Sequence, residues 1–158
     1  MNINQIAVCI LLATFAGCAT SRTTTDRRSA AASACAGVPE AERDTNPLRS
    51  GRVLAVQPLR EAPYTGRGPR TLRGATVILA ASPGMTQQWL QRLFECNAAR
   101  RALEGPASIA EDPCPLNLAI EAPTVSALAD SFAVSLRTDD SDDAERLVRK
   151  CLALLVQP

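Results

Sequence analysis

The chain has 158 residues, of which 46% are hydrophobic, 21% are charged and 3% are aromatic. Its formal net charge of +1 argues against a nucleic-acid-binding protein held mainly by neutralisation of phosphates. It contains no histidine, which excludes His-dependent catalytic triads and His-containing metal sites.

An apolar segment lies close to the start of the chain. Residues 6–16 read IAVCILLATFA and are followed by Gly17 and Cys18. A helix needs about 20 apolar residues to cross a bilayer, so this shorter run predicts a signal peptide rather than a permanent span. Its end, Phe15-Ala16-Gly17-Cys18, resembles the lipobox of bacterial lipoproteins, in which small residues precede a cysteine. The resemblance covers only this N-terminal segment.

The resemblance implies how the chain is processed and where it is held. Residues 1–17 would be removed as a signal peptide, the Cys18 thiol would carry a diacylglyceryl group, and the new amino group would be acylated. The next residue is Ala19 rather than Asp, which in this family favours the outer membrane of a Gram-negative cell. Three acyl chains would hold the protein to the membrane permanently, because each buried methylene contributes about 0.8 kcal/mol.

Other interpretations of this segment remain open. Gly17-Cys18-Ala19 also has the small residues of an ordinary secretory cleavage site, with cleavage after Ala19. The apolar run could also serve as an uncleaved anchor or as a buried helix of a cytosolic protein. These alternatives predict no lipid on Cys18.

Residues 18–46 differ in composition from the rest of the chain. They are rich in Thr, Ser and Ala with scattered charges, and they show no sustained apolar period. This composition predicts a disordered, lipid-anchored tether, in which a short helix around Ala30 to Ala36 would be marginal in isolation. A coil of this length spans roughly 30 Å, so the folded domain would stand clear of the membrane.

Residues 47–158 show the periodicities of a single folded domain. Apolar alternation or short apolar runs predict four strands, and apolar residues at spacings of three and four predict two helices, the first with Thr86 as its N-cap. This order, β-β-α-β-β-α, predicts an α+β two-layer sandwich with one four-stranded, mostly antiparallel sheet and both helices on one face. The predicted strands are residues 52–59, 75–81, 116–122 and 131–136, and the predicted helices are residues 86–104 and 142–156.

The cysteines predict a disulfide. Besides Cys18, four remain after removal of the signal peptide, and an oxidising periplasm would favour their pairing. We expect a Cys96–Cys114 bridge, which would tie the first helix to the loop before the next strand. Cys151 fits a buried thiol on an apolar helix stripe at least as well, and Cys35 could pair with any cysteine in reach or with none. A cysteine metal site is disfavoured by the lack of a Cys-x-x-Cys pair.

Two polar clusters have simple structural interpretations. The acidic run Asp139-Asp140-Ser141-Asp142-Asp143 lacks the Gly and Glu of an EF-hand and is typical of a helix N-terminus. Ser82-Pro83-Gly84 lacks the frame of a nucleophile elbow and predicts a turn. The single tryptophan, Trp89, is expected to anchor the core rather than to form a binding platform.

Charge is distributed unevenly along the chain. Between Arg49 and Arg73 there are six arginines and one acidic residue, Glu61, whereas between Glu104 and Glu145 there are ten acidic residues and one arginine. The two regions could simply pair with each other. Alternatively, the loop from Arg60 to Arg73 contacts anionic lipopolysaccharide, phosphate groups or an acidic protein.

The sequence therefore predicts an outer-membrane-anchored periplasmic lipoprotein that acts as a non-catalytic binding or structural component. Its expected partners are the membrane and an envelope protein or anionic envelope component, with no nucleic acid, cofactor or metal. One alternative is a small periplasmic enzyme built on Tyr64, Ser82 and the acidic cluster. Another is a cysteine-based metal or redox sensor, which would require the cysteines to converge.

Overall fold

The protein is built around one four-stranded antiparallel sheet, as seen in a computed structural model that describes residues 24–63, 66–104, 116 and 122–156. The order of strands across the sheet is β1-β2-β4-β3, and each neighbouring pair is antiparallel. The predicted α+β class is confirmed. The strands are β1 (Val53–Glu61), β2 (Thr71–Ala80), β3 (Thr124–Ala127) and β4 (Ser131–Arg137), and the two longest helices are α3 (Gln87–Glu104) and α4 (Ser141–Ala153).

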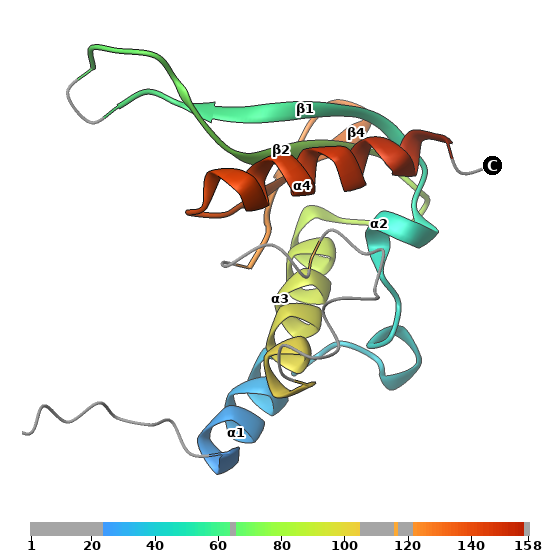
Figure 1. Ribbon diagram of the computed structural model, residues 1–158. Helices are drawn as coiled ribbons and strands as arrows, with labels where there is room; N and C mark the ends of the chain where they lie inside the picture. Colours follow the sequence, from blue (N-terminus) through green and yellow to red (C-terminus); the bar gives the residue numbers. More distant parts are fainter. Residues whose placement is uncertain (1–23, 64–65, 105–115, 117–121, 157–158) are drawn as a thin grey trace, which may run out of the picture.

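The helices cover one face of this sheet, with the sheet above them in Figure 1. Alternate residues of β2 and β4 point toward the helices and are buried, as the period of two predicts. Leu90 and Phe94 of α3 and Leu147 of α4 complete this main hydrophobic core. The sheet residues of the core are Ala75, Val77, Leu79, Val125, Phe132, Val134 and Leu136.

The two edges of the sheet are protected in different ways. At the β3 edge, Gln91 accepts a hydrogen bond from the Val125 N–H at 2.8 Å, and Gln87 donates to the Val125 carbonyl at 2.9 Å. These side chains take the place of a fifth strand. At the opposite edge, β1 contains Pro58, which cannot donate a ladder hydrogen bond and is therefore typical of an edge strand.

The third described strand, β3, lies just after the residues predicted for it. It pairs with β4 on the side opposite β2, whereas most of the predicted strand, residues 117–121, lies outside the described residues. Only Val125 of β3 is buried, so this strand carries almost no apolar alternation that could mark it in the sequence. The first strand also continues through Pro58 to Glu61, beyond its predicted end at residue 59.

Both long helices begin at the predicted polar residues. Thr86 accepts a hydrogen bond from the Trp89 N–H through its hydroxyl oxygen at 3.1 Å. Asp140 accepts from the N–H groups of Asp142 and Asp143 at 2.8 and 2.9 Å, so the acidic cluster caps α4 as expected. Helix α4 is followed directly by a 3-10 turn, η4 (Leu154–Val156).

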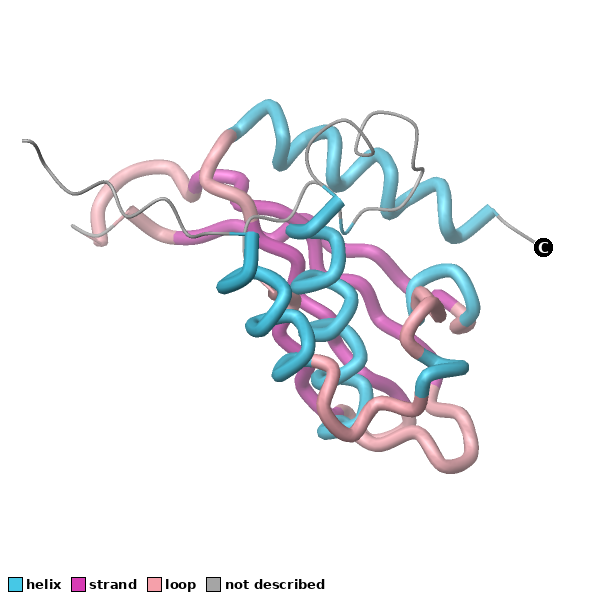
Figure 2. The backbone as a smooth tube through the Cα atoms, turned by 90° about the horizontal axis from the view of Figure 1, so that it is seen from below, coloured by secondary structure: helices cyan, strands magenta, loops and turns pink. Residues whose placement is uncertain are grey.

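The N-terminal region corrects the prediction of a disordered tether. Residues 24–46 contain α1 (Thr24–Ala34) and a 3-10 turn, η1 (Glu40–Glu42), followed by α2 (Pro47–Ser50). Figure 2 shows α1 lying alongside α3. Ala31, Cys35 and Val38 are buried, the last two in a second hydrophobic cluster with Leu93 and Cys96 of α3. The folded unit therefore begins by Thr24, and residues 18–23 of the predicted tether lie outside the described residues.

Gly74 lies where the backbone of β2 passes close to the backbone of β4. In the β1–β2 ladder Leu59 pairs with Gly74 and Arg60 with Leu72, which leaves Arg73 as the extra residue of a bulge. Gly74 has a φ of 146°, and a Cβ at this position would lie 1.9 Å from the Leu136 carbonyl oxygen. A side chain here would collide with backbone and force β2 and β4 apart.

We expect Gly74→Ala to lower the free energy of unfolding by more than about 2 kcal/mol, because strain at positive φ adds to the collision with β4. Gly84→Ala is the matched control: its φ is 80°, but a Cβ there meets nothing within 4 Å. The control should lose only about 1 kcal/mol. Urea denaturation of both variants measures the difference, and equal losses would contradict this account.

Candidate functional site: an arginine-bearing hairpin

The β1–β2 hairpin projects beyond the rest of the sheet. The last pairing of β4 with β2 is Arg137 with Gly74, whereas β1 and β2 continue to pair as far as Glu61 and Thr71. Beyond this point the two strands have no third strand beside them and run out as a free ribbon, at the upper left of Figure 1. The tip of the hairpin is thereby placed away from the core.

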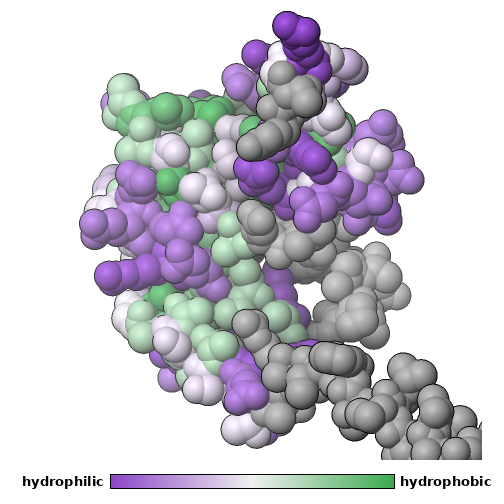
Figure 3. Space-filling view, turned by 90° about the vertical axis from the view of Figure 1, so that its left-hand side faces the viewer, coloured by the Kyte–Doolittle hydropathy of each residue, from purple (hydrophilic) through white to green (hydrophobic). Residues whose placement is uncertain are grey.

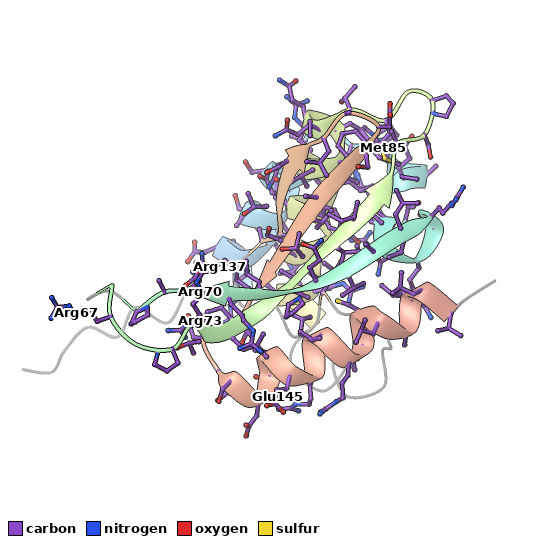
Figure 4. The ribbon with its side chains drawn as sticks, turned by 90° about the horizontal axis from the view of Figure 1, so that it is seen from above. Arg67, Arg70, Arg73, Met85, Arg137 and Glu145 are labelled. Atoms are coloured by element: carbon purple, nitrogen blue, oxygen red, sulfur yellow. A yellow bond between two sulfur atoms is a disulfide. The ribbon has the colours of Figure 1, made fainter. Side chains whose placement is uncertain are left out.

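Arginines gather along this ribbon and at its base. Arg60 lies on β1, Arg67 and Arg70 lie in the connection, and Arg73 lies on β2. Arg137, at the end of β4, lies at the base of the hairpin beside Arg73, and Arg67 points away from the body (Figure 4). In Figure 3 hydrophilic residues form the topmost part of this side of the molecule, beside an apolar area at the upper left.

A single acidic side chain partly balances these charges. Glu61 is 2.7 Å from Arg137 Nη1 and 4.0 Å from Arg73 Nε, measured from its carboxylate oxygens. Arg73 Nη1 also donates to the Asp139 backbone carbonyl at 3.0 Å. Within the described residues, Arg60 and Arg70 have no ion-pair partner. The hairpin therefore keeps a net positive charge.

The acidic residues at the start of α4 are engaged within their own helix. Asp140 caps the helix, Asp143 pairs with Arg146, and Glu145 lies 3.9 Å from Arg149. None of these three acids forms an ion pair with Arg60, Arg70 or Arg73. This observation favours the interpretation of the hairpin as a contact surface over mutual pairing of the two charged regions.

The base of the hairpin is hollowed. A depression of about 290 Å³ is lined by Glu61, Ala62, Pro63, Thr71 and Arg73. Arg73 and Glu61 are about one-third exposed there. An anionic group reaching this hollow would meet the Arg73 guanidinium at its wall, with the arginines of the tip beside it.

The predicted disulfide is present but has a different partner. Cys96 is bonded to Cys35, at a sequence separation of 61 and a Cα–Cα distance of 4.5 Å. A sulfur atom forms only one such bond, so the predicted Cys96–Cys114 bridge is wrong. The reason is that residues 24–38 do not form a tether: α1 packs against α3 and brings Cys35 to Cys96. Cys114 and the predicted lipid-bearing Cys18 lie outside the described residues.

The structure separates the groups that an enzyme would need. Ser82 follows β2 at one end of the sheet, and the acidic cluster follows β4 at the other, because β2 and β4 are antiparallel. Tyr64 lies outside the described residues. Cys151 is buried beneath the sheet, apart from the Cys35–Cys96 bridge, and no described group of three Cys, Asp or Glu residues could hold a metal ion.

Sequence reasoning missed the contacts that fasten the N-terminal region to α3. Trp89 donates through its indole N–H to Glu42 at 2.9 Å, and Asn97 donates to the Thr45 carbonyl at 3.1 Å. The four-residue spacing of Ala31 and Cys35 was the available signal, because it is the spacing of apolar residues on one side of a helix.

Comparisons with protein-family models, with curated proteins and with solved structures found no match. Among the described helices none is both long enough and apolar enough to cross a membrane.

We expect peptide mapping of the non-reduced protein to recover Cys35 and Cys96 as one linked pair. Replacing both with Ala should lower the free energy of unfolding by about 4 kcal/mol, the chain-entropy value for a loop of this length. A link from Cys96 to Cys114 or Cys151 would contradict the assignment. Cys151→Ala provides a control that removes a buried sulfur without touching the bridge.

Proposed function

We propose that this protein is a periplasmic lipoprotein, anchored in the outer membrane, that binds an anionic component of the cell envelope through the β1–β2 hairpin and performs no catalysis. The observation that carries the proposal is the projecting ribbon with its arginines, of which Arg60 and Arg70 have no ion-pair partner within the described residues. The lipid anchor rests on the lipobox-like sequence that ends at Cys18.

The chemistry of the hairpin suits phosphate and carboxylate groups. The guanidinium group is planar, always charged, and presents paired N–H donors that match the oxygens of a phosphate or carboxylate. The extended ribbon holds several of these groups clear of the body, so a large anionic surface can approach them. Lipopolysaccharide offers such a surface of phosphates and carboxylates.

A non-catalytic role is supported by the placement of the reactive side chains. Ser82 and the acidic cluster lie at opposite ends of the sheet, and the acids are used as helix caps and in ion pairs. Cys35 and Cys96 are joined in a disulfide and buried. A redox or metal sensor built on converging cysteines is therefore the less supported alternative.

The double variant Arg67→Gln/Arg70→Gln should weaken binding to lipopolysaccharide about tenfold or more, since each lost charged contact contributes roughly 1 kcal/mol or more. Isothermal titration with lipopolysaccharide aggregates measures the affinity, and raised salt should weaken binding of the parent protein more than of the variant.

Arg146→Gln/Arg149→Gln is the matched control, because it removes the same charge from α4, where both arginines lie near acids of their own helix. It should leave the affinity nearly unchanged. Equal losses in the two double variants would show that only net charge matters and would contradict a specific role for the hairpin.

Cys18→Ser should abolish lipid labelling and release the protein from the membrane fraction of the native host. Mass spectrometry of the mature N-terminus checks the acyl chains on the parent protein directly. A Cys18→Ser protein that still fractionates with membranes, or a parent protein that begins at residue 20 without lipid, would refute the anchor. Cys35→Ser serves as a control that removes a different cysteine and should leave lipid labelling intact.

A further inference from the structure

The ordered N-terminus limits how far the folded domain can stand from its anchor. Residue Thr24 already belongs to α1, so six residue steps separate it from Cys18. A fully extended chain covers at most about 3.5 Å per residue, which gives roughly 20 Å between the anchored cysteine and the start of α1. The start of this helix must therefore lie close to the membrane surface.

Helix α1 packs against α3. The Cys35–Cys96 disulfide fixes the chain just after the end of α1 to α3. Arg28, near the start of α1, lines the same depression as Arg100 and Leu103, near the end of α3. The two helices thus run in opposite directions. The start of α1 lies near the C-terminal end of α3, at the bottom of Figure 1.

This end of the molecule carries a second concentration of arginines. Arg27 and Arg28 lie on α1, and Arg100 and Arg101 lie on the last turns of α3. Within the described part of the chain, neither Arg27 nor Arg28 forms an ion pair, whereas Arg100 pairs with Asp44. Unlike the hairpin, this group of positive charges lies next to the segment that leads to the anchor.

The surface between these arginines is both charged and apolar. A depression of about 320 Å³ lies between α1, η1 and α3. Arginine side chains and two acids form the charged part of its lining. Small apolar side chains form the remainder, together with Leu103, which is 40% exposed. Its lining residues are Arg28, Ala31, Ala32, Cys35, Glu40, Arg43, Asp44, Arg100 and Leu103.

We infer that the end formed by the start of α1 and the end of α3 docks on the anionic phospholipid headgroups of the membrane that holds Cys18, with Arg27 and Arg28 contacting their phosphates. This inference rests on the lipid anchor of the proposed function and adds an orientation to it. Helix α3 then rises from the membrane, and the sheet lies at the far end of the molecule, where its open face and the hairpin are presented to other envelope components.

The lipidated mature protein, reconstituted into vesicles, tests this orientation. An added tryptophan reports proximity to headgroups through quenching by a headgroup spin-labelled lipid. Leu103→Trp places the tryptophan at the end of α3, and Leu128→Trp, the matched control, places it in the β3–β4 turn. These leucines are 40% and 49% exposed, so both positions tolerate the larger side chain. Native Trp89 gives the same background in both variants.

On vesicles of phosphatidylethanolamine and phosphatidylglycerol, quenching at position 103 should exceed that at position 128 at least about twofold, because α3 alone separates its two ends by about 25 Å. Adding Arg27→Gln/Arg28→Gln should reduce quenching at position 103 toward its value on phosphatidylethanolamine alone. Arg146→Gln/Arg149→Gln, which alters α4 instead, should leave it unchanged.

Equal quenching at the two positions, or stronger quenching at position 128, would overturn the orientation. Unchanged quenching in the Arg27→Gln/Arg28→Gln variant would overturn the phosphate contact. Mass spectrometry of the same preparation distinguishes a wrong docking inference from a wrong lipid anchor. Without acyl chains on Cys18 both proposals are wrong, whereas with acyl chains present and quenching equal only the docking inference is wrong.

Discussion

The burial of α3 on two sides is the constraint on which the rest of the structure depends. Leu90 and Phe94 fill the main core beneath the sheet, while Leu93 and Cys96 belong to the second cluster with Cys35 and Val38. A helix buried in two directions cannot shift without opening one of the clusters, because protein interiors are closely packed. The sheet and the N-terminal region are therefore positioned relative to each other through α3.

The disulfide strengthens this arrangement at the point where hydrophobic burial is smallest. The second cluster contains only four buried residues, two of which are the bonded cysteines. A small cluster of this kind stabilises a packed helix weakly, since stabilisation scales with the apolar area removed from water. In an oxidising compartment the disulfide adds the stability that this small cluster lacks. It also fixes the N-terminal region, which the sequence predicts to be disordered, to α3.

The two concentrations of arginine acquire different meanings once the fold is known. Arg27 and Arg28 lie beside the segment that leads to Cys18, whereas Arg67 and Arg70 lie on a ribbon at the sheet end of the molecule. A near-neutral net charge conceals this separation. We propose that one group faces the membrane and the other faces a partner, so that the elongated form of α3 acts as a spacer between them.

The sequence by itself determined the elements whose signals are local. Apolar periodicity located α3, α4, β2 and β4, and the capping chemistry of Thr86 and Asp140 located the helix starts, because these depend on residues within a few positions of each other. The tertiary structure decided the rest. The pairing of Cys96 with Cys35, the strand at Val125 and the ordering of residues 24–46 depend on groups distant in sequence. Their stabilising contacts exist only after α3 has packed, so a local pattern such as the four-residue spacing of Ala31 and Cys35 indicates at most a helix and not its partner.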